Sequence, residues 1–439
     1  MKRFTALVIV LMMLVALVPA AFAEETVTLD FLYWADDVQT QLLTAACKAY
    51  EDANPGVKIN AQALPADGTF DSYIQTRMAS NQLPDVSYMG ESDIMKYDKM
   101  GILADISDLI ASGAIPEKLS AVTIRNADGK VIGVGLSNQL VVLYYNKDKF
   151  DQANLAYPPS DVKDAWDWDT FVNTAKKLTV DANGKNATEE GFDPSKIMEY
   201  GLGFNCLREF HQFWAMYANN GGVVSADGKD FLWDSDKSAL GLQKLVDLMH
   251  VDHVAPQALY NWASDIGSVR DAINGGFAMF TNGSWDLANI TPDDHIGVGV
   301  LPKMEKAVTM NCGAPMVVYN TSKHIDEAKK FYAYMVDPAK NLPLLQSGAW
   351  LPNQANWYTD ESLISQWADK LPFGAKETIL SYSNTEGSIA QWPAYYVLKY
   401  QDMSTLYEKE IDNALMGNET VAEAFAKCMP GIKDAFTSK

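Results

Sequence analysis

The stretch Thr26-Val-Thr-Leu-Asp-Phe-Leu-Tyr-Trp34 opens a regular alternation of strands and helices. Its β-branched and aromatic residues predict a strand. Residues 39–54 then carry apolar side chains at helical spacing, and Asn54-Pro-Gly56 predicts the end of that helix. The same run continues with a predicted strand at 57–64, a helix at 69–81 and a short buried strand at 83–89. This β-α-β-α-β order favours a parallel sheet covered by helices, so we expect an α/β fold.

The middle of the chain extends this pattern. We expect strands at 141–145 and 277–280, the second followed by a turn over 281–285. Helices are predicted at 168–178, 210–220 and 239–252, and a polar loop at 181–193. Since no long linker or internal repeat separates these elements, we expect two lobes with several chain crossings and a cleft between them.

The first 23 residues have the layout of a secretory signal peptide. Lys2 and Arg3 precede an apolar run over 6–18, and Ala21-Phe-Ala23 predicts cleavage before Glu24. The apolar run is too short to span a membrane, and no cysteine stands at the cleavage site for a lipid anchor. We therefore expect a periplasmic or secreted protein, which excludes ATP-dependent and genome-reading roles. Removal of 23 of the 439 residues would leave 416, enough for two lobes.

Charge and composition narrow the class of ligand. The chain has 56 acidic and 35 basic residues and a net charge of −21, which disfavours nucleic acid and anionic membranes. Its 11 Trp and 20 Tyr offer flat apolar faces of the kind that stack on sugar rings. The four cysteines (Cys47, Cys206, Cys312 and Cys428) form no C-x-x-C motif, and both disulfides and free thiols remain open.

Catalytic and metal motifs are not evident in the sequence. His250-Val-Asp-His253 has no third ligand nearby, so we expect no metal and no cofactor. A G-x-S-x-G elbow, an H-E-x-x-H motif and a phosphate-binding loop are absent from the sequence, and no pair of carboxylates stands out. We therefore expect a protein that is not an enzyme.

Seven segments, taken in order, resemble a known family. They are Leu83-Pro-Asp-Val86, Val142-Leu-Tyr-Tyr-Asn-Lys-Asp148, Trp166-Asp-Trp-Asp-Thr-Phe171 with Ala175-Lys-Lys-Leu-Thr179, Phe277-Ala-Met-Phe-Thr-Asn-Gly-Ser-Trp285, Val298-Gly-Val-Leu-Pro302, Glu327-Ala-Lys-Lys-Phe331 and Ser347-Gly-Ala-Trp-Leu-Pro352. Together they resemble the extracellular solute-binding proteins (family 1) of bacterial ABC sugar importers, in the branch that includes maltose-binding protein. The resemblance implies two α/β lobes joined by hinge strands, a carbohydrate bound between them, an ABC transporter permease as partner, and a monomer.

The resemblance also implies where the lobes divide. The hinge crossings are expected near 138–141, 311–315 and 365–376. The first lobe would then comprise residues 24–138 and 312–372, and the second residues 139–311 and 373–439.

A set of ligand-binding residues follows from the predicted cleft loops and from the resemblance. Aromatic rings would stack on sugar rings, and carboxylates and amides would bind hydroxyls. The expected residues are Trp34, Asp36, Asp37, Tyr88, Glu91, Ser92, Asn138, Gln139, Glu209, His211, Gly283, Trp285, Trp350, Trp392 and Tyr395. Met89 and Asp93 stand where the maltose-type pattern has aromatic and basic contacts, so maltose itself is not predicted.

Three other functions remain open. Acidic residues near Trp34 and Glu91 are compatible with a cationic solute such as a polyamine. A secreted glycoside hydrolase would require a pair of catalytic carboxylates. A sensor subunit that signals to a membrane receptor would have the same fold.

Overall fold

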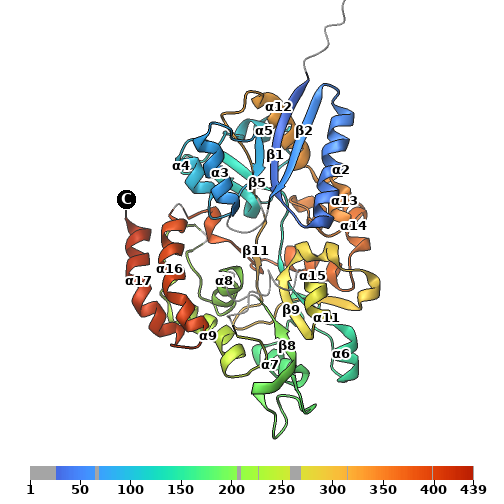
Figure 1. Ribbon diagram of the computed structural model, residues 1–439, viewed down its shortest axis with the longest axis vertical. Coiled ribbons are helices and arrows are strands. Elements are labelled where there is room, and N and C mark those ends of the chain that lie inside the picture. The colour runs from blue at the N-terminus through green and yellow to red at the C-terminus, as the bar shows by residue number, and fades with distance from the viewer. Residues whose placement is uncertain are drawn as a thin grey trace, which may run out of the picture.

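The computed structural model describes residues 26–64, 69–204, 209–225, 227–257, 268–313, 315–397 and 399–438. The fold is mixed α/β with two lobes, each built on its own sheet (Figure 1). We call the lobe with the six-stranded sheet the first lobe and the lobe with the five-stranded sheet the second lobe. The predicted signal peptide, residues 1–23, lies outside the described residues.

The sheet of the first lobe has the strand order β2-β1-β3-β12-β5-β4. Its strands are β1 (Val27–Trp34), β2 (Val57–Leu64), β3 (Val86–Tyr88), β4 (Thr123–Arg125), β5 (Val131–Gly135) and β12 (Pro315–Val318). β1 pairs in parallel with β2 and β3, as the sequence predicts, whereas β12 pairs antiparallel with β3 and β5. The prediction of a parallel sheet is therefore wrong for the sheet as a whole, because a strand from late in the chain and the β4–β5 pair complete it.

Helices cover both faces of this sheet. Figure 1 shows α2 and α13 on one side and α3 and α4 on the other. α2 begins after Asp36, whose carboxylate accepts a hydrogen bond from the Gln39 amide, and it buries Leu43, Cys47 and Tyr50. The helices are α2 (Asp37–Ala53), α3 (Thr69–Ala79), α4 (Ile94–Lys99), α5 (Ser107–Ala111), α12 (Ile325–Met335), α13 (Leu342–Gln346) and α14 (Glu361–Trp367).

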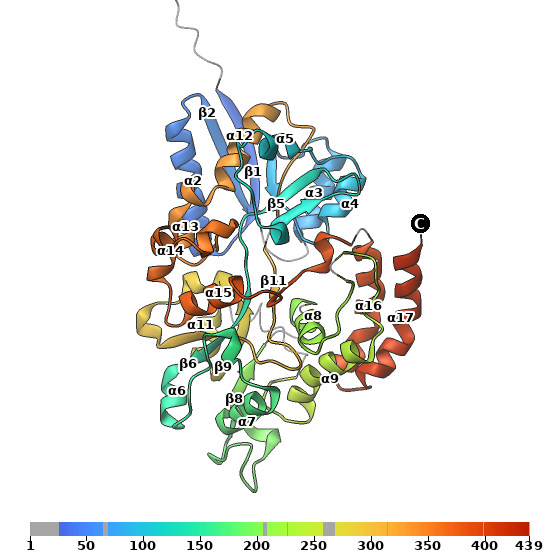
Figure 2. The ribbon, with the colours of Figure 1, turned by 180° about the vertical axis from the view of Figure 1, so that it is seen from behind.

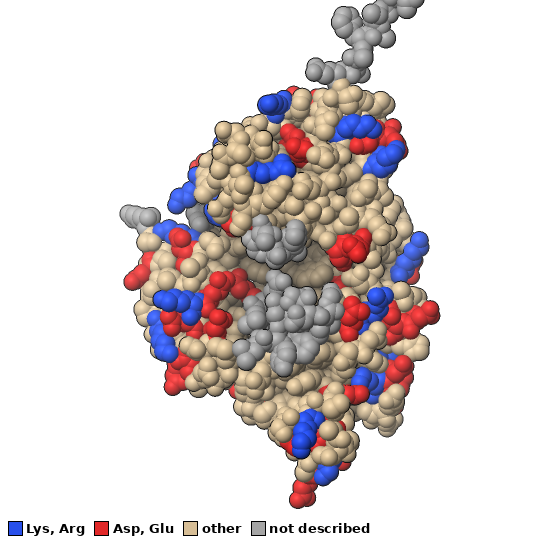
Figure 3. All heavy atoms as spheres, in the orientation of Figure 1, with Lys and Arg blue, Asp and Glu red and all other residues tan. Residues whose placement is uncertain are grey.

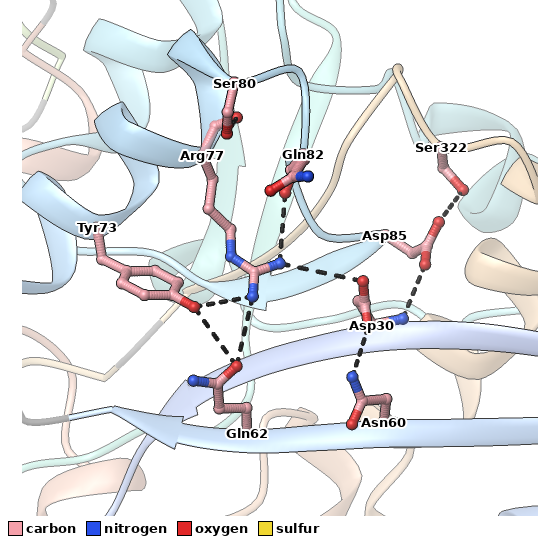
Figure 4. A network of polar contacts seen from close by, with 9 residues as sticks. All are labelled: Asp30, Asn60, Gln62, Tyr73, Arg77, Ser80, Gln82, Asp85 and Ser322. Atoms are coloured by element: carbon pink, nitrogen blue, oxygen red, sulfur yellow. Dashed lines mark hydrogen bonds and ion pairs between the residues drawn. The ribbon is translucent and has the colours of Figure 1, made fainter.

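A polar network fixes α3 across β1 and β2 (Figure 4). Arg77 of α3 donates to the Tyr73 hydroxyl at 2.8 Å and lies 4.0 Å from Asp30 of β1. Asn60 of β2 donates to the same Asp30 carboxylate at 2.7 Å. Asp85, just before β3, accepts the Asp30 backbone N–H at 2.8 Å. Because these partly buried carboxylates are all partnered, the network orders the strands at little desolvation cost.

The sheet of the second lobe has the order β10-β6-β9-β8-β7. Its strands are β6 (Val141–Asn146), β7 (Val180–Asp181), β8 (Ile197–Gly203), β9 (Phe277–Gly283) and β10 (Ile296–Gly299). β9 pairs antiparallel with β6, and this pairing continues to Gly283 opposite Val141. The turn predicted over 281–285 is therefore wrong for its first three residues, which extend the strand because β6 supplies their hydrogen-bond partners.

Helices surround the second sheet, and the aromatic helix α8 is almost entirely buried beneath them. Figure 1 shows α16 and α17 on the same side as α9, with α11 and α15 on the other. The helices are α6 (Lys147–Gln152), α7 (Trp168–Leu178), α8 (Glu209–Ala218), α9 (Asp236–His250), α11 (Val269–Asn274), α15 (Ala375–Ser383), α16 (Tyr400–Leu415) and α17 (Val421–Thr437). Short 3₁₀ helices lie between the helices and strands along the chain: η1 (Ser120–Val122), η2 (Val162–Asp164), η3 (Pro194–Lys196), η4 (Ser284–Asn289), η5 (Pro292–Asp294), η6 (Pro338–Lys340), η7 (Ala355–Tyr358), η8 (Ala368–Lys370) and η9 (Pro393–Tyr395).

A third, two-stranded sheet joins the lobes. β11 (Thr309–Asn311) and β13 (Ile389–Gln391) run parallel, with β11 between the lobes in Figure 2. Residues 136–140 lead from β5 to β6 and run beside the segment that follows β11. The Cys312 amide of that segment donates a hydrogen bond to the Gln139 carbonyl at 2.9 Å. The serine hydroxyl of Ser137 accepts the Leu351 amide at 2.6 Å. Three stretches that are distant in sequence thus meet between the lobes.

The described cysteines are buried in the protein, and His250 lies within hydrogen-bonding distance of a backbone carbonyl. Cys47, Cys312 and Cys428 are buried free thiols, and Cys206 lies outside the described residues. His250 Nε2 lies 2.9 Å from the Leu415 carbonyl, and no group of three or more potential metal ligands occurs in the described part of the chain. Within that part, we also find no helix with the length and apolar character needed to cross a membrane.

Candidate ligand-binding cleft

A hollow crosses the middle of the molecule between the two lobes (Figure 3). Acidic side chains lie on both sides of it in this view. In the first lobe β1 ends at Trp34 just before α2, and the loop after β3 leads into α4, while in the second lobe η4 follows β9. The packing of α2 against η4 and of α4 against η9 brings the two sets of elements together.

Aromatic rings form the wall of the first lobe. Trp34, the last residue of β1, is half-buried and meets Phe70 and Tyr88 edge-on, with ring centroids 4.9 and 5.2 Å apart. Tyr88 is buried behind it, and its hydroxyl has no hydrogen-bond partner among the described residues. Tyr88 and Phe70 therefore hold the Trp34 ring in a fixed orientation.

Carboxylates line the start of α2. Asp36 Oδ1 accepts the Gln39 amide at 2.7 Å, and Asp36 Oδ2 accepts the side-chain amide of Asn289, from the second lobe, at 3.2 Å. Asp37, the first residue of α2, is exposed. Both carboxylates lie at the N-terminus of α2, where the positive end of the helix dipole stabilises them.

Glu91 lies close to the segment that follows β11. The Glu91 Oε1 atom is 3.5 Å from the hydroxyl of the buried residue Tyr395. The same hydroxyl donates a hydrogen bond to the Gly313 carbonyl and accepts one from the Gly313 amide at 3.1 Å. Burial raises the pKa of the Glu91 carboxyl above its ordinary value. Ser92 is half-buried in the same turn.

The side-chain amides of Asn138 and Gln139, which were expected at the first hinge crossing, already have partners inside the protein. Asn138 Oδ1 accepts the Asn311 side-chain amide at 2.5 Å, and Gln139 Nε2 donates to the Ala349 carbonyl at 2.6 Å. Both residues are buried, and Gln139 Oε1 has no partner among the described residues. In this arrangement, the amides hold the crossing segments together.

Trp285 is a tryptophan that is expected from the sequence on the second-lobe side of the cleft. It is half-buried in η4, and its ring folds back over the backbone of Gly283. A Cβ at position 283 would lie only 1.9–2.1 Å from three atoms of that ring, so only glycine fits there. The Trp285 ring also meets Phe210 edge-on, at 5.9 Å between centroids.

Glu209 and His211 anchor α8 from its first turn. Glu209 accepts hydrogen bonds from the hydroxyls of Tyr400 and of Ser404, the latter at 2.5 Å. Burial raises the pKa of Glu209 to about 7, although both hydroxyls lower it. His211 is 1% exposed, and its Nε2 lies 2.9 Å from the Thr281 hydroxyl. Both side chains therefore have internal partners.

The remaining expected tryptophans differ in exposure. Trp350 is only 5% exposed and belongs to the core. Trp392 is half-buried, lies 6.0 Å from Phe210 between ring centroids, and packs against the cores of both lobes. The structure thus brings Trp285 and Trp392 together around Phe210, and Trp34 together with Tyr88 on the first lobe.

The structure adds residues that sequence reasoning missed. Asp286 accepts the side-chain amides of Asn282 at 2.6 Å and Asn289 at 3.0 Å. Burial raises the pKa of Asp286 to about 6. Phe210, the common neighbour of two tryptophans, was likewise missed. These residues carry no local motif, and only the position of Asp286 directly after Trp285 could have drawn attention to it.

Comparison with known proteins identifies the family. The sequence profile of the bacterial extracellular solute-binding proteins matches residues 45–371. The chain belongs to this family. This solute-binding protein is 25% identical over 328 residues to the multiple sugar-binding protein of Streptococcus mutans, a match that covers 71% of each chain.

Solved structures confirm the two-lobed α/β fold. An ABC substrate-binding protein from Listeria monocytogenes, in complex with cycloalternan, superposes with a TM-score of 0.75 at 21% identity, over 94% of this chain and 100% of that one. The maltose/maltodextrin-binding domain from Bdellovibrio bacteriovorus, bound to maltotriose, gives a TM-score of 0.72 at 17% identity, with the same two coverages. The family and fold expected from the sequence are therefore confirmed.

Proposed function

We propose that this solute-binding protein captures a mono- or oligosaccharide between its lobes and delivers it to the permease of an ABC transporter. The observation that carries the proposal is the pair of half-buried indoles, Trp285 and Trp392, held around Phe210, together with the half-buried indole of Trp34 at the end of β1 in the first lobe. Rigid aromatic faces with acidic groups beside them suit the apolar faces and hydroxyls of sugars. The sugar ligands in the names of the relatives support this reading.

Each part of the cleft has a role in this proposal. Trp34, Trp285 and Trp392 stack on sugar rings, while Asp37, Glu91 and Ser92 bind hydroxyls. Because the ligand contacts both walls only when they approach, it favours the closed arrangement by the difference in contact energy. Binding is the activity, with no catalytic step.

The same proposal covers topology and location. We infer lobes of residues 24–138 plus 312–372 and 139–311 plus 373–439, joined by three crossings. The hydrogen bond of the Cys312 amide to the Gln139 carbonyl, and the place of β11 between the lobes, support the crossings near 138–141 and 311–315. We also infer a monomer, exported with cleavage before Glu24 to the periplasm or the medium.

A thermal-shift screen of residues 24–439 tests the function. The panel contains maltotriose, cycloalternan, arabinooligosaccharides and monosaccharides, with spermidine, putrescine and amino acids as controls. A ligand at a hundred times its Kd stabilises the folded state by about 2.7 kcal/mol. A sugar shift that Trp285→Ala abolishes and Trp168→Ala preserves supports the cleft. Trp168 is the matched control, because it is a half-buried indole on the outer helix α7, with Lys244 over its ring. No shift with any sugar would refute the proposal.

A cationic solute is the second candidate. The cleft walls carry the carboxylates of Asp36, Asp37, Glu91 and Asp286, which favour an amine over an anion. A spermidine shift that weakens as salt rises would favour this ligand, since salt screens charge–charge attraction but hardly affects sugar stacking.

A further inference from the structure

The side-chain amide of Asn289 makes one of the contacts between the two lobes. Asn289 ends η4, the helix that carries Trp285, and lies beside α2 of the first lobe. Its Nδ2 donates to Asp36 Oδ2 of the first lobe at 3.2 Å and to Asp286 Oδ1 of the second at 3.0 Å. An amide nitrogen has two N–H groups, so both are used.

The electrostatics of this contact explain why an amide is needed there. Asn289 brings Asp36 and Asp286 together where η4 packs against α2. Burial is the main cause of the raised pKa of Asp286, and the nearby Asp36 charge raises this pKa further. Without a donor between them, two carboxylates brought together across the lobes repel. Asn289 replaces this repulsion by two hydrogen bonds to charged acceptors, which are stronger than bonds between neutral groups.

Only one of these two bonds crosses between the lobes. Asp286 has a second donor, Asn282 at 2.6 Å, that belongs to its own lobe. Asp36 has a second role as well, because its Oδ1 caps α2 through the Gln39 amide while Oδ2 faces Asn289. The contact between lobes can therefore be removed without removing the cap.

We propose that Asn289 is a positioning residue that latches the lobes together: its bond to Asp36 stabilises the closed arrangement and holds η4, with Trp285, against the first lobe. The latch acts on the equilibrium between open and closed lobes even without solute. The inference that this raises solute affinity rests on the function proposed above.

Single-molecule FRET tests the latch in the ligand-free protein, with dyes on Lys58→Cys of the first lobe and Met198→Cys of the second, both exposed positions. Asn289→Ala and Asp36→Ser each remove the bond between lobes, and serine keeps a cap for α2. We expect Asn289→Ala to lower the ratio of closed to open molecules about fivefold, which corresponds to about 1 kcal/mol for a hydrogen bond at a partly exposed site. Asp36→Ser should lower this ratio by no more than that, because it removes the repulsion between Asp36 and Asp286 together with the bond. The double variant should fall no further, because both single changes remove the same bond.

Asn282→Ala is the matched control, since it removes the other side-chain amide donor to Asp286, at 2.6 Å, without touching Asp36. It should leave the ratio of closed to open molecules at the wild-type value. Equal ratios in all variants, effects that multiply in the double variant, or an equal loss in Asn282→Ala would each overturn the latch. No sugar is used, so a wild-type protein that binds none would refute the proposed function and leave this test intact.

Discussion

Gly283→Ala provides a direct test of the cleft geometry. The new methyl group would lie 1.9–2.1 Å from three atoms of the Trp285 ring, far inside van der Waals contact. The strand cannot relieve this clash easily, because Gly283 is paired with Val141 of β6 and its carbonyl accepts the Tyr144 hydroxyl at 2.8 Å. The indole must therefore rotate away from its place over the strand.

The expected effect has two parts. Overpacking of this kind lowers the free energy of unfolding by about 1–3 kcal/mol. Loss of a positioned aromatic partner costs a further 0.5–1.5 kcal/mol of binding, roughly a two- to twelvefold increase in Kd. Isothermal titration calorimetry with a sugar found in the screen measures the second part, and thermal unfolding measures the first.

Gly203→Ala separates the two parts. A Cβ at position 203 would lie 2.4 Å from the Phe280 ring, a similar clash in the same sheet against a core side chain. This control should lose stability and keep the wild-type Kd. A Gly283→Ala protein that binds sugar with the wild-type Kd, or a Gly203→Ala protein that weakens binding equally, would refute the assigned role of Trp285.

Two further changes test groups that lie outside the walls of the cleft. Glu209 has a folded-state pKa of about 7, above its ordinary value of 4.5, so its ionisation removes stability as pH rises between these values. The free energy of unfolding of the wild type, measured relative to that of Glu209→Gln, should therefore fall as pH rises from 4.5 to 7, by up to about 1.4 kcal/mol per pKa unit. Urea titrations at several pH values measure this difference. A difference that does not change with pH would contradict the reasoning. Asn353→Ala should lower the free energy of unfolding by about 2–4 kcal/mol, because it removes the donor to the Gly135 carbonyl and leaves buried Lys118 with one acceptor fewer. If denaturant unfolding shows that Asn353→Ala lowers the free energy of unfolding by less than about 0.5 kcal/mol, the hydrogen bonds of Asn353 to Gly135 and Lys118 do not stabilise the fold as expected.

The sequence predicted local elements well where the pattern was regular. The helix at 168–178 has the predicted bounds, and the strand at 57–64 does too. The strand at 277–280 was predicted too short, because Thr281, Asn282 and Gly283 look like turn residues and become a strand only through β6. Similarly, nothing near residue 315 shows that β12 inserts antiparallel between β3 and β5.

The candidate site shows the same division. Trp34 ends strand β1, and Trp285 comes two residues after the end of strand β9. The sequence could predict both near the cleft, because the ends of strands and the loops after them were expected to form it. Which polar groups already have partners could not be predicted, since the partners of Asn138 and Glu209 are 173 and 195 residues away in sequence.

By itself, the sequence determined the α/β class, the order of the early elements and the family, because periodicity and motif order are local properties that survive in the linear chain. Only the tertiary structure decided the strand order of the mixed sheet, the contacts of residues 136–140 with the segments at 312 and 351, and the hydrogen bond between Asp36 and Asn289. These depend on contacts between residues as much as 253 positions apart. Such contacts arise from the simultaneous packing of both lobes, which no local pattern encodes.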